Sequence, residues 1–135
     1  MSQGPGRRVP ALLVAHGGLA PELKATAESI AGAADDLVCL SNRDCSPEEL
    51  AEEVGRCLDA RGPGCIVMVD LAGGSCLAAV QRACRNRSDV AVVAGVNLPL
   101  LLDYIQKRET LSRDDLLAHM LDRGRDGLRV VIGGS

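Results

Sequence analysis

The sequence predicts a doubly wound α/β fold, in which helices cover both faces of a mostly parallel sheet. Short apolar runs alternate with segments of helical periodicity along the chain of 135 residues, a pattern typical of this class. Some runs, such as residues 65–69, are apolar throughout, as expected for strands that are covered on both faces. Because the sequence contains no internal repeat and no linker, we expect one domain with one buried core.

Strands are expected wherever an apolar run is bounded by turn residues. They occupy residues 9–15, 36–41, 65–69, 89–94 and 128–132. Parallel neighbours require right-handed crossovers, and the flavodoxin-like strand order 2-1-3-4 arranges the first four strands in this way. The last strand, 128–132, has no obvious partner in that order.

Helices are expected between these strands, and several of them carry clear end signals. They occupy residues 21–31, 47 to about 62, 75–87, 100–107 and 113 to about 123. Ser46 precedes Pro47, and Glu49 completes a capping box with Ser46. Ser112 is a second N-cap, and Gly32 is a suitable C-cap.

The composition argues against nucleic-acid binding. The chain has no Phe, no Trp and one Tyr, so it lacks the aromatic platforms on which single-stranded bases stack. Its net charge of −3 creates no general attraction to DNA or to anionic lipid. We therefore expect no nucleic-acid partner.

The chain also lacks the signals of a membrane or secreted protein. No apolar run approaches the roughly 20 residues that span a bilayer. Residues 1–8 are polar and contain no apolar segment of a signal peptide. We expect a short disordered leader at 1–8, a single domain at 9–132, and a cytoplasmic protein.

The six cysteines predict neither a disulfide framework nor a metal site. They show no C-x-x-C spacing, and no histidine lies at zinc-finger distance. We expect buried, unreactive thiols, no metal and no cofactor. Cys76 carries an alternative hypothesis, because it lies at a predicted helix start, where the pKa of a thiol can be lowered.

Two loops at strand ends contain the candidate site. His16 follows the first strand and precedes two glycines, and the loop 70–75 follows the third strand. In the strand order 2-1-3-4 these two strands are neighbours, and ligands bind in the crevice at their carboxyl ends. We therefore expect His16 and Asp70 to lie in one crevice. Each loop has a plain structural explanation as well, since glycines, aspartates and histidines also serve as turn and cap residues.

These residue types are suited to phosphoryl transfer. A neutral imidazole is a good nucleophile near pH 7, provided that its other nitrogen is held as N–H by an acceptor. Asp70 or a backbone carbonyl of the loop can be that acceptor. Gly73, Gly74 and the hydroxyl of Ser75, at the start of a predicted helix, would form a cradle for phosphate oxygens. His16 is therefore the predicted phosphoryl acceptor.

Three motifs together resemble the mannose-family enzyme IIA domain of the bacterial phosphotransferase system. They are the segment that begins at His16, the loop 70–75 and the segment 95–101, which reads Gly-Val-Asn-Leu-Pro-Leu-Leu. The resemblance extends from about residue 9 to 132. It implies a cytoplasmic phosphocarrier in which the general phosphocarrier protein HPr phosphorylates His16, Asp70 binds this histidine, and Ser75 lies beside the phosphate.

The resemblance also implies partners and an assembly. The phosphoryl group would pass from His16 to a IIB component, and then to a sugar that enters through a membrane transporter complex. The family forms homodimers in which the last strand crosses to the neighbouring subunit, and residues 128–132 would be that strand. Considered by itself, this segment could also pair within its own chain.

Other functions remain open at this point. The chain could be a standalone regulatory module that signals the state of the phosphotransferase system through His16. A subunit of a dihydroxyacetone kinase is less consistent with the glycines of the loop 70–75. A metabolic enzyme acting on a small phosphate ester would need a Lys or Arg near His16, and the sequence suggests none in the loops.

Overall fold

The apolar runs form a four-stranded parallel sheet, as the sequence predicts. The computed structural model describes residues 8–134. The strands are β1 (Ala11–Ala15), β2 (Val38–Ser41), β3 (Ile66–Val69) and β4 (Ala91–Ala94). They lie in the order β2-β1-β3-β4, so β1 and β3 are central and the predicted order 2-1-3-4 is confirmed.

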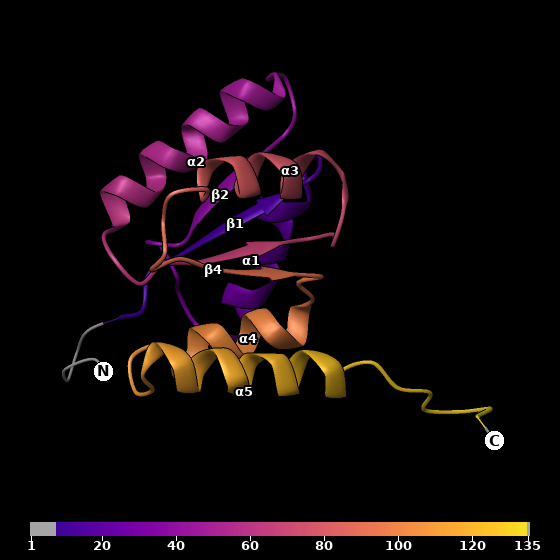
Figure 1. The fold of residues 1–135 in the computed structure, drawn as a ribbon. Coiled ribbons are helices and arrows are strands. Elements are labelled where there is room, and N and C mark those ends of the chain that lie inside the picture. The colour runs from indigo at the N-terminus through magenta and orange to yellow at the C-terminus, as the bar shows by residue number, and fades with distance from the viewer. Residues whose placement is uncertain (1–7, 135) are drawn as a thin grey trace.

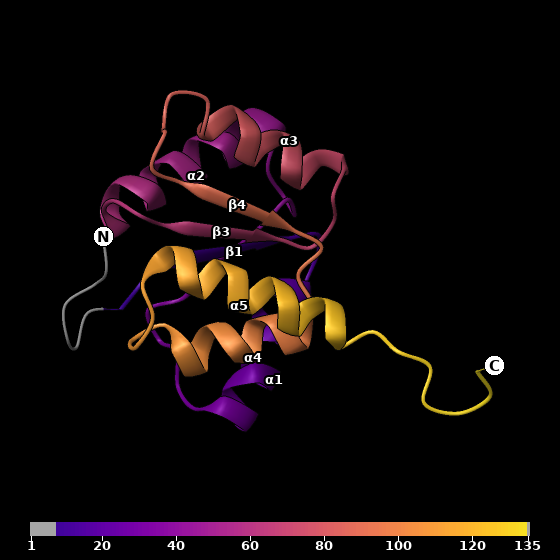
Figure 2. The same ribbon diagram turned by 60° about the horizontal axis from the view of Figure 1, so that its bottom comes forward.

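Helices cover both faces of this sheet (Figures 1 and 2). One layer contains α1 (Leu19–Ala31), α4 (Leu98–Lys107) and α5 (Arg113–Asp126). The other contains α2 (Pro47–Arg61) and α3 (Gly74–Ala83). Successive side chains of β1 enter opposite cores, because Leu13 packs towards the first layer and Leu12 and Val14 pack towards the second.

The predicted caps are present, although several helix bounds differ from the prediction. The Ser46 hydroxyl accepts a hydrogen bond from the Glu49 N–H at 3.1 Å, and the Glu49 carboxylate accepts one from the Ser46 N–H at 2.8 Å. The helix expected from residue 21 begins at Leu19 instead. Pro21 is accommodated there because the N–H groups of a first helical turn have no partner within the helix.

The segment 128–132 is not a strand within this chain. It extends away from the body of the molecule (Figure 1). Val131 is 84% exposed and Ile132 is 90% exposed. An isolated strand is not stable in water without a partner, which explains why these apolar residues form none here. The possibility that the segment pairs within its own chain is therefore wrong for the residues that the structure describes. Its exchange with a second copy stays a prediction.

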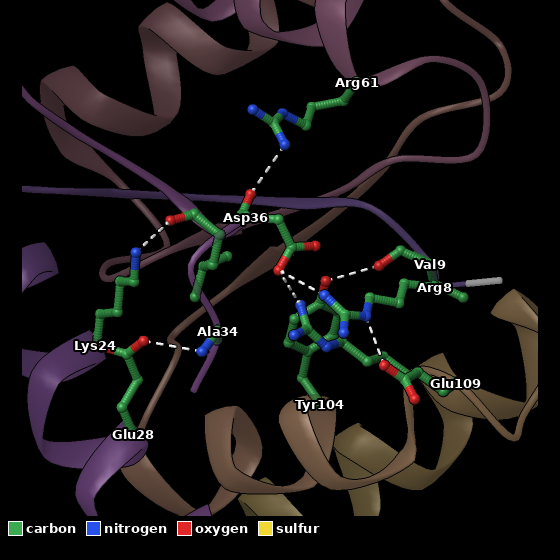
Figure 3. A network of polar contacts seen from close by, with 11 residues as sticks. Arg8, Val9, Lys24, Glu28, Ala34, Asp36, Arg61, Tyr104 and Glu109 are labelled. Atoms are coloured by element: carbon green, nitrogen blue, oxygen red, sulfur yellow. Dashed lines mark hydrogen bonds and ion pairs between the residues drawn. The ribbon is translucent and has the colours of Figure 1, made fainter. Parts of the chain in front are cut away.

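Residues 1–7 of the expected leader lie outside the described residues, whereas Arg8 is bound to the domain. Its guanidinium forms ion pairs with Asp36 and Glu109. Arg61 donates a hydrogen bond to the main-chain carbonyl of Asp36, so two cationic side chains approach this residue from different elements (Figure 3).

Asp36 also binds a buried arginine next to the single tyrosine. Arg108 is 2% exposed, and it donates a hydrogen bond to the Asp36 carboxylate at 2.9 Å. Its guanidinium lies 5.5 Å from the centre of the Tyr104 ring. The Tyr104 hydroxyl in turn donates to the carbonyl of Val9 at 2.6 Å. This network joins the start of β1 and the approach to β2 to the end of α4.

We expect the ion pair between Asp36 and Arg108 to make stability depend on acid pH. Burial alone would raise the pKa of the Asp36 carboxyl, but the charge and hydrogen bond of Arg108 outweigh it and hold the pKa below the ordinary value of 3.8. The stabilisation is complete above the unfolded-state pKa, near 4, and is lost as the pH falls through the lowered pKa. Arg108→Met should lower the free energy of unfolding by about 2 kcal/mol at pH 7, because Asp36 is only partly buried.

Urea unfolding of both proteins at pH 7 and pH 3 measures this contribution. The difference between wild type and Arg108→Met should narrow at pH 3, because this pH lies below the unfolded-state pKa of Asp36 and protons then favour the unfolded wild-type chain. Arg61→Met is the matched control, because Arg61 contacts the carbonyl of Asp36 and not its carboxylate. An equal loss at both pH values for Arg108→Met would show that packing, and not the ion pair, accounts for its effect.

Candidate active site

The ends of β1 and β3 bring the two predicted site residues together. Val14 of β1 is level with Val69 of β3, and each strand ends within one residue of that pair. His16 and Asp70 are the first residues beyond these ends. The Asp70 N–H donates to the carbonyl of Val14 at 3.3 Å, which anchors the second loop to the first strand. The predicted crevice residues are therefore adjacent because the strands that carry them are neighbours.

Asp70 holds His16 through both its backbone and its ring. One carboxylate oxygen accepts a hydrogen bond from the His16 N–H at 3.0 Å. The same oxygen lies 3.0 Å from His16 Nδ1, and the other lies 3.2 Å from it. An ionised carboxylate accepts hydrogen bonds only, so in the neutral imidazole Nδ1 carries the proton and Nε2 keeps its lone pair. The Asp70 carboxylate that orients the ring is nearly buried, whereas the side chain of His16 is 35% exposed.

The glycine loop leaves space at that free nitrogen. Gly74 has φ = +86°, a conformation that L side chains rarely adopt. A Cβ at this position would lie 3.3 Å from His16 Nε2. The hydroxyl of Ser75 lies 3.4 Å from the same atom. Helix α3 begins at Gly74. Its N-cap residue is Gly73, so no side chain of the N-cap occupies the free N–H groups of the first turn. The positive end of α3 is thus close to Nε2, as a phosphate cradle requires.

The loop after β2 forms a third side of the site, which the sequence reasoning missed. The amide oxygen of Asn42 accepts a hydrogen bond from the Gly17 N–H at 3.1 Å. The amide nitrogen of Asn42 lies 3.3 Å from the Ser75 hydroxyl. Asn42 therefore links the loop after β1 to the loop 70–75, which follows β3. The available signal was its position directly after the second strand, which neighbours the first strand at the same edge of the sheet.

Arg43 corrects the expectation that no Lys or Arg lies near His16. A Cβ on Gly17 would lie 3.2 Å from Arg43 Nη2, so the guanidinium lies against the residue that follows the histidine. Arg43 also lines a depression of about 370 Å³ beside Gly17 and Gly18. Arg43 lies in a turn that includes Asp44 at φ = +60°, a conformation that is uncommon outside glycine but that aspartate adopts more often than most residues.

Cys76 is close to the site but is not an activated thiol. Burial, followed by the charge of Asp70, raises the pKa of Cys76 above its ordinary value, and the residue is fully buried. These observations contradict the hypothesis of a reactive Cys76. Donor atoms of His16, Asp70 and Cys76 lie within 4.8 Å of one another, a grouping that spacing along the chain does not reveal because two separate loops contribute to it. Such a set could hold a metal ion, although in this structure His16 and Asp70 are bound to each other.

The expectation of buried thiols holds for Cys65 and Cys76, whereas the other four cysteines are only partly buried. All six cysteines are free, and burial raises the pKa of Cys65 to about 12. His119 of α5 pairs through Nδ1 with Asp103 of α4 at 2.7 Å, and its side chain is 38% exposed. It is thus partly buried, and it is bound to a different carboxylate from that of the site.

Comparisons with known proteins identify the family to which this chain is similar. Residues 11–121 match the protein family EIIA-man, described as "PTS system fructose IIA component". The "PTS system mannose-specific EIIAB component" of Escherichia coli (strain K12) is 30% identical over 123 residues, which cover 86% of this chain and 37% of that protein. The chain thus spans just over a third of the length of this relative. The "PTS system sorbose-specific EIIA component" of Klebsiella pneumoniae is 34% identical over 55 residues, or 41% of each chain.

Solved structures share the fold over nearly the whole chain. The "phosphotransferase system component EIIA" from Streptococcus agalactiae superimposes with a TM-score of 0.81 at 22% identity, covering 90% of this chain and 95% of its own. The "mannose/sorbose specific IIA subunit" from Enterococcus faecalis also gives 0.81 at 21% identity, covering 96% and 98%. Among the described residues, no helix is long and apolar enough to cross a membrane. Since the family match extends from β1 into α5, the chain belongs to the EIIA-man family of phosphotransferase system IIA components.

Proposed function

We propose that this protein is a phosphocarrier in which His16 accepts a phosphoryl group from HPr and passes it to a IIB component during sugar uptake. The observation that supports this most is the pairing of Asp70 with Nδ1, which leaves the lone pair of Nε2 beside the open side of Gly74. The mannose- and sorbose-specific names of the relatives favour a sugar substrate of the transport complex without naming it.

The transfer itself follows from the positions of these groups. The lone pair of Nε2 attacks the phosphorus, and the bond between phosphorus and the donor atom breaks, with its electron pair returning to the donor. The imidazole of His16 gains positive charge in this step, and the Asp70 carboxylate stabilises that charge. The Ser75 hydroxyl and the N-terminus of α3 stabilise the three phosphoryl oxygens. Transfer to the IIB component is the same step in reverse with a different partner.

Intact mass spectrometry tests this proposal. The protein is incubated with phosphoenolpyruvate, the general phosphotransferase enzyme and HPr. We expect a mass gain of one phosphoryl group that is lost in acid, as phosphohistidine requires. Absence of a gain, when a control IIA protein in the same reaction is labelled, would reject the phosphocarrier function. A labelled protein that transfers to no IIB component would instead favour the regulatory module.

We also propose that two copies exchange the segment 128–132. Within residues 8–134, the outer edge of β4 pairs with no other strand, and Val92 on this strand is 38% exposed. A depression of about 330 Å³ lies beside this edge, between the end of β4 and helix α5. An uncovered apolar segment and an uncovered strand edge on the same chain favour pairing with a second copy.

Removal of residues 128–135 should convert a homodimer to a monomer. Sedimentation equilibrium should give twice the 14.1 kDa chain mass for the full protein and a single chain mass for the truncated one. Val92→Lys should weaken the dimer as well, because a charge on a strand edge disfavours pairing. A full-length protein that sediments as a 14.1 kDa species would contradict the exchange.

A further inference from the structure

We propose that Asn42 is a positioning residue for phosphoryl transfer, which acts by orienting the Ser75 hydroxyl towards His16 Nε2. This inference rests on the phosphocarrier function proposed above and concerns the same site. Asn42 lies directly after β2 and contacts the loops that follow β1 and β3. It is the side chain through which the outer strand of the sheet reaches the two loops of the site.

The contacts of Asn42 determine which way its amide points. The backbone N–H of Gly17 is only a donor, so the Asn42 atom that receives it at 3.1 Å must be the oxygen. The amide nitrogen therefore faces Ser75, and since this nitrogen is only a donor, the Ser75 oxygen accepts its hydrogen bond at 3.3 Å. The orientation of the amide thus follows from the backbone of Gly17.

The same reasoning then determines the direction of the Ser75 hydroxyl. Its oxygen accepts from Asn42, so its own proton is free to point towards Nε2, which lies 3.4 Å away and has no proton because Asp70 binds Nδ1–H. The Asn42 amide thus donates to the Ser75 oxygen, and the Ser75 hydroxyl donates to His16 Nε2. When the phosphoryl group is on Nε2, the same hydroxyl proton points at a phosphoryl oxygen, where it stabilises negative charge.

The backbone of the first loop is held from the same side. The Gly17 N–H binds Asn42, and the Gly17 carbonyl accepts a hydrogen bond from the Ser41 hydroxyl at 2.7 Å. Ser41 and Asn42 therefore bind both backbone polar groups of Gly17, the residue that follows the nucleophile. A site held in this way needs little reorganisation when the donor protein docks.

Two substitutions and their combination test this role. Asn42→Asp keeps the oxygen that accepts from Gly17 and removes the donor to Ser75. Ser75→Ala removes the hydroxyl on which Asn42 is proposed to act. The rate of phosphorylation by phosphorylated HPr is measured for wild type, both single variants and the double variant, at a series of donor concentrations, so that kcat and KM are separated.

We expect kcat to fall about tenfold in Asn42→Asp with KM little changed, because the loss affects the transfer step and not docking. Ser75→Ala should lower kcat by a similar or larger factor. The double variant should be no slower than Ser75→Ala, since Asn42 then has no hydroxyl to orient. If Asn42→Asp lowers kcat equally in both backgrounds, its added charge or a structural change is responsible, and the proposal is rejected.

A charge-matched variant and the wild type complete the design. Asn86→Asp makes the same chemical change on an exposed turn beyond the far end of α3, and it should leave kcat unchanged. Wild-type protein that takes up no phosphoryl group would reject the proposed function itself. If wild type and Asn42→Asp are phosphorylated at equal rates, only the role of Asn42 is rejected.

Discussion

His16→Ala should take up no phosphoryl group under conditions that label the wild-type protein completely. The alanine removes the only atom that we propose forms a bond to phosphorus, so the loss is complete and not a matter of degree. The substitution leaves Asp70 part-buried without its ring partner, and circular dichroism is needed to show that the variant is folded. The measurement is intact mass after incubation with phosphoenolpyruvate, the general phosphotransferase enzyme and HPr.

His119→Ala is the matched control for this result. The chain contains two histidines, and each binds an aspartate through Nδ1. His119 lies on α5 and pairs with Asp103 of α4, whereas His16 lies beside Gly74 and Ser75. The His119→Ala variant should be labelled like wild type. Persistent labelling of His16→Ala would show that another residue accepts the phosphoryl group.

Asp70→Asn should slow phosphorylation about a thousandfold while leaving the fold intact. A carboxylate can only accept from Nδ1, whereas the amide of an asparagine can also donate to it, which allows the proton to move to Nε2 and removes the lone pair that attacks. The neutral amide also fails to stabilise the positive charge that develops on the ring. In an unrelated enzyme, the equivalent change in a Ser-His-Asp triad costs about ten-thousandfold. The side chain of His16 is 35% exposed, so water screens part of the effect and we expect a smaller loss.

Rapid-quench measurement of label transfer from phosphorylated HPr determines this rate. Asp103→Asn is the control, because it alters the other aspartate that binds a histidine. A rate for Asp70→Asn within a few-fold of wild type would mean that the carboxylate holds the loop in place and does not select the protonation state of His16.

Local sequence patterns predict much of the fold. The apolar runs at Leu12 to Val14 and Ile66 to Val69 become the central strands because a fully apolar strand is stable only when both of its faces are covered. The caps at Ser46 and Ser112 form as expected because an N-cap is satisfied by atoms within three residues.

The principal site residues are also predictable, for a topological reason. His16 and Asp70 follow strands whose adjacency is implied by the strand order, so their proximity requires no knowledge of side-chain packing. Gly74 and Ser75 follow from the same loop. These residues could therefore be placed in one crevice before any distance was known.

The tertiary structure alone decided how the loop after β2 completes the site. Asn42 and Arg43 contact the site through side chains from the turn after β2. Cys76 is buried in the core that α2 and α3 share. The sequence by itself determined the strand order, the caps and the proximity of His16 and Asp70, because these depend on periodicity and on contacts that are local or implied by topology. The structure decided that Asp70, and not a backbone carbonyl, binds the His16 ring. The Asn42 contacts, the Arg43 guanidinium and the uncovered state of residues 128–132 are set by non-local packing, which no short pattern encodes.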